Sequence, residues 1–467
     1  FDRHLYEKGG AVLHMLRGEL GDARFWRSIR RYVAANAQRN VETIDLIRAI
    51  EEATGRNMRA FFDQWVFRGG HPDIELNVAW DAERKAATVT IDQKQRIDDE
   101  HPAYRFNLDI GFVDEAPDRV QSNAGSGALP DERRIRVSVE RAHETITIPL
   151  GAEPKLVRLD PGAFVLGSVA YMFGPELAAA SLRGDPDVVA RIRAARALAK
   201  DGGSAARDAL IAAFANEPFW GVLDEASAAL GATKAPWARE ILTDALAHPH
   251  PKVRRAAASA LGSFRSADAA QVLIAAAQSD PSYFVRAAAL ASLGKTRDVR
   301  AYDILREAVM QRSWNGTVEA GAVRGLAELA DARAVDAIIE ATKLGRDEGL
   351  RRAAVASIGR SGEVVGEART KVADVLNGLL DDPMFLVQLA AIAAAESLED
   401  QRLLGTLDRL SSNAFDGRVR RDAMEAAMRI REGQKVPSQV SAMRSDLDLL
   451  REEQRKLQEK IEALSHT

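Results

Sequence analysis

The chain has 467 residues, more than one hydrophobic core usually organises, which predicts about three domains. Its 64 Lys and Arg residues nearly balance its 68 Asp and Glu residues, which argues against a nucleic-acid partner, and the absence of cysteine excludes disulfides and thiol catalysis. Because no run of about 18 apolar residues occurs, we expect a soluble protein with no membrane partner, in a compartment that the sequence does not reveal.

Residues 1–70 show the spacing of amphipathic helices. Apolar residues recur three or four positions apart up to Leu20, and Gly21 then predicts a helix end with Asp22 as the next N-cap. A later helix is predicted to begin at Thr43 and to end at Gly55. We therefore expect a helical domain over this range.

Residues 71–167 change to alternation of apolar and polar residues with a period of two. The first run extends from Ile74 to Trp80 and the last from Ile146 to Leu150, and turn residues separate the runs. The Gly- and Ser-rich stretch 122–130 is predicted to be a loop. Several short alternating strands predict a small β-sandwich.

Residues 168–434 carry a sequence repeat. One position, which we call the marker, is held by an apolar residue at steps of 31 to 33 residues, with one longer step of 37: Ala190, Val222, Val253, Val285, Val318, Leu350, Val387 and Val419. A Leu or Ile usually follows eight residues later, often with Gly directly after it. This punctuation predicts a HEAT-like α-solenoid of about eight helix pairs. The fold class is thus mostly α with a small β-sandwich.

Residues 435–467 are predicted to form one further helix. Two sets of residues recur seven apart: Val440, Leu447, Gln454 and Ile461, then Met443, Leu450, Leu457 and Leu464. This pattern is typical of a coiled coil, and self-association through residues 438–467 is one interpretation. The other is a helix that folds back and caps the last repeat. The sequence leaves both open.

Tyr6-Glu7-Lys8-Gly9 opens a series of short motifs along the N-terminal region. The others are Leu20-Gly21-Asp22, Phe25-Trp26, Thr43-x-Asp45, Glu51-x-x-x-Gly55, Phe61-Phe62-x-x-Trp65 and Gly70-His71-Pro72. Together they resemble the aminopeptidase N family of zinc metallopeptidases. The specific resemblance covers about residues 1–165, and its order of parts implies the end of a thermolysin-like catalytic domain followed by a sandwich and a helical domain.

The resemblance implies where the chemistry lies. In this family a His-Glu-x-x-His motif and a later Glu hold one zinc, and these elements would precede Phe1. We therefore expect zinc in a full-length parent, but no metal ligand in this chain. Only Tyr6 matches a functional residue of the family, as a phenol that donates to the oxyanion of the scissile carbonyl. Gly9 and Gly10 are predicted to allow close approach of another backbone.

Two functions remain open. The first is the C-terminal part of a zinc aminopeptidase that removes N-terminal residues from peptides, in which the solenoid limits substrate size. The second is a non-catalytic HEAT-repeat scaffold derived from the same fold. An intact upstream zinc motif would favour the enzyme.

Arginines recur one residue after the marker, at Arg254, Arg286, Arg351 and Arg420. Their recurrence indicates that they line one surface. The first three are candidate substrate-binding residues for the carboxylates of a peptide. The alternative is that they are solvated or form salt bridges between repeats.

Overall fold

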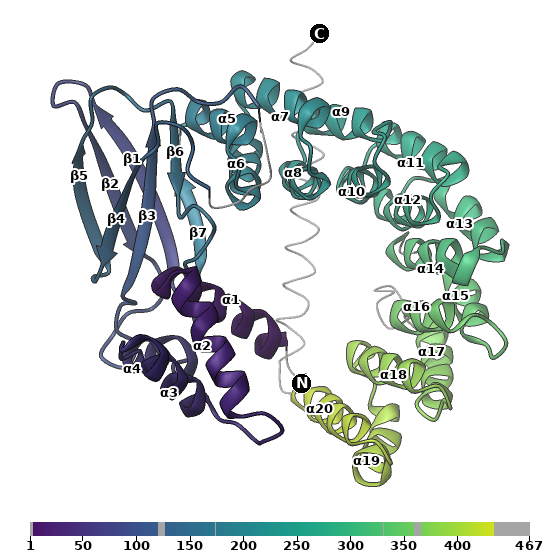
Figure 1. Ribbon diagram of the computed structural model, residues 1–467. Coiled ribbons are helices and arrows are strands. Elements are labelled where there is room, and N and C mark those ends of the chain that lie inside the picture. The colour runs from purple at the N-terminus through teal and green to yellow at the C-terminus, as the bar shows by residue number, and fades with distance from the viewer. Residues whose placement is uncertain (1–2, 120–126, 173, 330, 359–365, 434–467) are drawn as a thin grey trace. The chain divides into compact units, whose positions relative to one another are not determined.

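The protein is described by a computed structural model that covers residues 3–119, 127–172, 174–329, 331–358 and 366–433. It divides into two compact units, residues 1–257 and 258–467. Figure 1 labels the elements of both.

Four α-helices and one π-helical turn open the first unit. Their bounds are α1 Arg3–Leu20, α2 Asp22–Ala35, α3 Thr43–Thr54, α4 Arg59–Phe62 and the π-turn Asp63–Phe67. Leu16, Ile50 and Phe62 lie in their shared core. Gly21 has a φ of 74° and is itself the N-cap of α2, so the predicted cap at Asp22 is wrong: Asp22 is the first residue of the helix.

Seven strands form two sheets between residues 73 and 172. Their bounds are β1 Asp73–Asp81, β2 Ala86–Gln93, β3 Phe106–Val113, β4 Arg133–Val139, β5 His143–Pro149, β6 Leu156–Leu159 and β7 Ser168–Met172. One sheet has the order β5-β2-β1-β7 and the other β4-β3-β6. All the pairs are antiparallel except β1 with β7, which is parallel and sets Ile74 opposite Val169.

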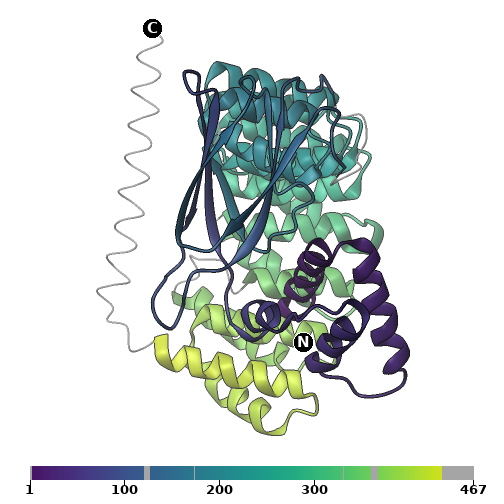
Figure 2. The ribbon, with the colours of Figure 1, turned by 60° about the vertical axis from the view of Figure 1, so that its left-hand side comes forward.

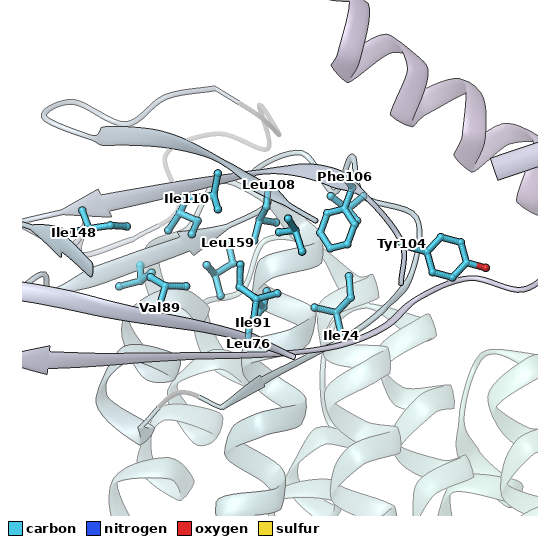
Figure 3. Close-up of a cluster of buried hydrophobic side chains, with 14 of the residues drawn as sticks. Ile74, Leu76, Val89, Ile91, Tyr104, Phe106, Leu108, Ile110, Ile148 and Leu159 are labelled. Atoms are coloured by element: carbon cyan, nitrogen blue, oxygen red, sulfur yellow. The ribbon is translucent and has the colours of Figure 1, made fainter. Parts of the chain in front are cut away.

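Alternate residues of both sheets point into one apolar layer, as the period of two predicts. Figure 3 shows Ile74, Leu76 and Ile91 of one sheet facing Leu108 and Ile110 of the other. The sequence pattern missed β6, which is buried along its whole length and so does not alternate. It also missed β7. The N-terminal helices lie at one end of these strands (Figure 2).

Six helices of the repeat array follow in the first unit, and the boundary between the units falls within the last of them. Their bounds are α5 Pro175–Gly184, α6 Val188–Asp201, α7 Ser204–Asn216, α8 Trp220–Thr233, α9 Pro236–Ala245 and α10 Pro251–Leu261. Contacts join α5 to α7 and α6 to α8, so alternate helices form two layers.

The second unit continues the array with ten further α-helices among its described residues. Their bounds are α11 Ala267–Ser279, α12 Tyr283–Thr296, α13 Ala301–Met310, α14 Thr317–Leu329, α15 Ala334–Thr342, α16 Glu348–Ile358, α17 Gly366–Leu379, α18 Phe385–Leu398, α19 Leu404–Asn413 and α20 Gly417–Gly433. Two short 3-10 turns, Trp314–Gly316 and Gln401–Leu403, precede α14 and α19. Each even-numbered helix from α12 contacts the next even-numbered helix, up to α20.

The marker residues all lie on even-numbered helices, from Ala190 on α6 to Val419 on α20. From Val222 onward each marker is at most 3% exposed, which confirms that the sequence period tracks the packed face. Glycine permits the closest approach in the second unit. A Cβ on Gly294 of α12 would lie 1.9 Å from the carbonyl oxygen of Gly325 on α14, so only hydrogen fits there.

The mostly helical fold with small sheets agrees with the sequence prediction. β7 pairs with β1 beyond residue 167, so the observed sheet runs past the predicted end of the sandwich. The four predicted domain ranges otherwise stay predictions, and the predicted helix of residues 435–467 lies outside the described residues. No helix in the described ranges is long and apolar enough to span a membrane.

Candidate functional site

Tyr6 lies in the second turn of α1, and its side chain is 71% exposed. Lys8, two residues later, donates from Nζ to the carbonyl oxygen of Gly70 at 3.1 Å. Tyr104 holds the same segment, since its hydroxyl donates to the Gly69 carbonyl at 3.0 Å. The Arg68 guanidinium lies 4.0 Å from the centre of the Tyr104 ring. The segment that follows the π-turn therefore ties the start of α1 to the sandwich.

The middle of α1 rests on the loop between β6 and β7. His14 donates from Nε2 to the carbonyl oxygen of Gly162 at 2.8 Å, and its ring stacks on Phe164 with centroids 4.5 Å apart. A Cβ on Gly18 would lie 2.8 Å from the same phenylalanine ring. The tight contact in α1 is thus at Gly18 and is with a side chain, whereas the close approach of another backbone expected at Gly9 and Gly10 is not found among the described residues. A Cβ at either of the two earlier glycines would meet no described atom within 4 Å.

A buried carboxylate shapes this loop. Asp160 has a φ of 50°, and its two carboxylate oxygens accept the backbone N–H groups of Phe164 and Val165 at 3.0 and 2.9 Å. Burial raises the pKa of Asp160 above its usual range. The N–H of Gly162 donates to Asp187 Oδ2 at 2.6 Å. Gly162 thus contacts α1 through its carbonyl and the N-cap of α6 through its amide.

A second buried cluster joins β6 to the first helices of the array. Arg158 on β6 contacts Glu132 at 2.6 Å and Asp185 at 3.2 Å, and all three side chains are at most 1% exposed. Burial raises the pKa of Asp185 to about 6, although Arg158 favours its charged form. Arg191 donates to the Asp185 carbonyl at 2.7 Å and pairs with Glu217 at 2.9 Å. The Asp160 loop contacts α1 directly, and this buried cluster adjoins the loop.

Sequence patterns do not reveal these supporting residues. Asp160-Pro161-Gly162 is a turn signal, and it was the one local clue to the loop. Arg158 lies in a short, fully buried strand. The sequence around it does not indicate which distant residues it contacts. Pairing across 26 and 27 residues comes from tertiary contacts that spacing does not encode.

A cavity of about 730 Å³ lies elsewhere in the first unit, between α5 and α7. The described residues that line it include Leu182, Arg183, Ala209 and Glu217. Tyr6 does not line it, so this cavity and the predicted catalytic tyrosine are separate features.

The described residues do not fit a zinc site. A catalytic zinc needs three protein ligands. No group of three His, Asp or Glu side chains within the described ranges is arranged to hold a metal ion. His14 is engaged with Gly162, and His143 contacts Asp92 at 2.7 Å. No chemical step is therefore derived through a metal in this chain.

The predicted substrate-binding arginines all contact their own array. Arg254 donates to the carbonyls of His248 and Pro249, and Arg286 donates to Ala277 at 2.8 Å and Gln311 at 3.1 Å.

Arg351 is 1% exposed, donates to the Thr342 carbonyl at 2.8 Å and forms a salt bridge with Asp382. Asp382 belongs to the segment that precedes the next marker helix, so this pair joins neighbouring repeats. The geometry of these arginines favours the inter-repeat alternative. Their role in substrate binding stays a prediction.

Three parts of the chain match known families. Residues 1–65 match the peptidase family M1 domain. Residues 175–250 and 239–312 match HEAT repeats, and residues 318–343 match the PBS lyase HEAT-like repeat. These matches fall on the N-terminal helices and on the repeat array.

Several curated relatives are similar over part of the chain. Aminopeptidase N of Lactococcus lactis subsp. lactis is 31% identical over 129 residues, which is 28% of this chain and 14% of that protein. Aminopeptidase M1-A of Oryza sativa subsp. japonica is 33% identical over 78 residues, 17% of this chain and 9% of that protein. Tricorn protease-interacting factor F2 of Thermoplasma volcanium is 31% identical over 77 residues, 16% and 10% of the two chains. The chain thus spans a small fraction of the length of these relatives.

A solved structure extends the likeness to the fold of nearly the whole chain. The crystal structure of Legionella pneumophila aminopeptidase A in complex with aspartic acid is similar with a TM-score of 0.58 and 14% identity. The similarity covers 93% of this chain and 57% of that one. At this identity it shows the fold alone. With the M1 match at the N-terminus and the HEAT repeats after the sandwich, the chain resembles the C-terminal portion of a peptidase family M1 aminopeptidase.

Proposed function

We propose that this chain is part of a metalloaminopeptidase that hydrolyses N-terminal residues from peptides. The observation that carries the proposal is the match of residues 1–65 to the peptidase family M1 domain, with Tyr6 inside the matched range. Relatives named aminopeptidase, similar over part of the chain, support it. The metal would be held by residues outside this sequence.

Tyr6 is proposed as the oxyanion donor. When water adds to a peptide carbonyl, the oxygen gains negative charge, and a phenol O–H stabilises that charge by a hydrogen bond without giving up its proton. The exposed side chain of Tyr6 supports this role, because a donor must reach a substrate rather than the core. Lys8 and His14 support it as positioning residues, since their hydrogen bonds fix the helix that carries Tyr6.

The N-terminal region also carries exposed apolar side chains that could contact a further domain. Leu13, Trp26, Val33 and Phe67 are all more than a third exposed. Large apolar side chains that stay exposed on successive elements are available for contact with a partner. We propose that the remainder of the catalytic domain covers them, and that the solenoid limits the size of the peptide substrate.

The proposal is tested by comparing this chain with a longer protein that also contains a His-Glu-x-x-His motif. After dialysis, we expect the chain alone to retain no stoichiometric zinc and to release no product from an aminoacyl anilide, because its described residues contain no group of three ligands arranged to hold a metal ion. We expect the longer protein to do both.

Stoichiometric zinc with turnover by the chain alone would contradict the division of labour proposed here. A longer protein that has the intact motif but cleaves no aminoacyl substrate would favour the scaffold.

A further inference from the structure

The glycine contacts of α12 and α14 show which face of a marker helix meets the next repeat. A Cβ on Gly325 of α14 would lie 2.4 Å from the carbonyl oxygen of Leu290, and one on Gly294 would lie 1.9 Å from that of Gly325. Leu290 and Gly294 lie five and nine residues after the marker Val285. These two positions therefore face the following repeat.

The same face is buried in the earlier repeats of the second unit. The residues five after the marker are 0–2% exposed in four successive helices: Leu290, Val323, Val355 and Ile392. In α20 the corresponding residue is Met424, which is 58% exposed. Met428, nine residues after the marker Val419, is 50% exposed. The last repeat thus presents the face that would meet a following repeat.

The side chains on this face are apolar where a chain end is normally polar. A terminal repeat needs a polar outer face to stay soluble on its own. Methionine is instead flexible and polarisable, and adapts to an apolar partner. Arg431 is one helical turn from Met428 and pairs with Asp408 at 2.6 Å. An apolar centre with a charged rim is the pattern of an interface.

We propose that residues 438–467 of this chain cover Met424 and Met428 as an amphipathic helix that runs antiparallel to α20. The segment lies outside the described residues, and it begins five residues after Gly433, where α20, the helix that carries the exposed face, ends. Gly433 and Pro437 are the residues expected where a helix ends and the chain reverses. The attachment through so short a connection gives the segment a high effective concentration at this face.

The spacing of apolar residues in the segment matches the exposed face. Met428 lies five residues before the end of α20 at Gly433, and Met443 lies five residues after Ser438. At a rise of about 1.5 Å per residue, both are about 7.5 Å from the reversal. If the proposed helix begins at Ser438, Leu447 lies nine residues from its start, as Met424 lies nine residues from the end of α20. Two apolar pairs therefore come into register, Met428 with Met443 and Met424 with Leu447.

Disulfide trapping in the full chain tests this register, because the chain contains no cysteine of its own. Two double variants are made, M428C/M443C and M424C/L447C, with M428C/S445C as the matched control. A disulfide forms only when the two Cα atoms approach to about 4.4–6.8 Å. Ser445 lies two residues beyond Met443 and so points to the opposite side of the predicted helix.

We expect both double variants to form an internal disulfide, seen as a shifted monomer band without reductant, and the control to form none. Because Met424 and Met428 are exposed, the helical signal by circular dichroism should be unchanged. A disulfide-linked dimer in place of the shifted monomer would overturn the proposal and assign the face to a second copy of the chain. No disulfide in either variant, or equal trapping in the control, would overturn it as well.

Discussion

The helix that carries Tyr6 and the repeat array are held together in different ways. α1 is fixed by contacts that each occur once: Lys8 with Gly70, His14 with Gly162, and Gly18 against Phe164. The array of the second unit repeats the same contacts, with a buried marker in every even-numbered helix. Contacts that occur once can hold one particular side chain in a defined position. Contacts that recur along the array position each repeat against the next one. The proposed chemistry accordingly lies in the aperiodic region.

The arginines after the marker show the repeated kind of contact most clearly. Arg191 and Arg351 are both buried, and both donate to a backbone carbonyl and pair with a carboxylate. Arg286 follows the same plan with the amide of Gln311 as its second partner. The recurrence of arginine after the marker thus coincides, at these three positions, with hydrogen bonds inside the array.

The largest effect is expected for Arg351→Ala. Removal of one partner leaves Asp382 as a nearly buried charge without its guanidinium, which costs about 3–5 kcal/mol of unfolding free energy. The matched control is Arg352→Ala, since this neighbouring arginine is exposed and its loss should have little effect. Chemical denaturation of both variants measures the difference. Equal stability of the two, with weaker peptide binding by Arg351→Ala alone, would restore the substrate-binding prediction.

A smaller effect is expected from the titration of Asp185. Its pKa is raised to about 6 by burial, so the folded state binds this proton more tightly than the unfolded state does. The stability that protonation contributes is complete below about pH 4 and is lost as the pH rises through 6. The free energy of unfolding of the wild type relative to Asp185→Asn should therefore fall by up to about 3 kcal/mol between pH 4 and pH 7.5.

Urea denaturation of both proteins at each pH gives this difference, and groups that titrate equally in the two proteins cancel. A constant difference, or one that grows with pH, would show that Arg158 keeps Asp185 charged throughout.

The smallest effect concerns the support of α1. His14→Ala removes one hydrogen bond and one stacked ring, which together contribute about 1–2 kcal/mol. His143→Ala is the control, because His143 is exposed on the sandwich and its pair with Asp92 is solvated. Thermal unfolding separates the two. Equal loss in both variants would mean that α1 does not depend on the loop at Gly162.

Much of the fold was open to prediction because its packing is periodic. The repeat marker identified every even-numbered helix from α6, and alternation found five of the seven described strands. β6 was missed because all four of its side chains are buried, including that of Arg158, so there is no alternation to detect. The N-cap of α2 was predicted at Asp22, but it is Gly21, which has a positive φ.

The site was predictable only through the motif around Tyr6. That motif identified Tyr6, which lies within the range that matches the M1 domain. The groups that contact α1 lie about 60 to 150 residues away in the sequence. Tertiary contacts of this kind leave no period in the sequence. The tail after Gly433 has a clear period, but two partners satisfy it equally, so periodicity alone did not choose between them.

The central claim is that Tyr6 stabilises the oxyanion, and Tyr6→Phe in an active longer protein tests it most directly. We expect kcat to fall about 10²–10³-fold while KM changes little, because the lost hydrogen bond forms chiefly in the transition state. Tyr32→Phe on α2 is the control, and its kinetics should match those of the wild type. A loss confined to KM, or no change with Tyr6→Phe, would contradict the catalytic role of Tyr6.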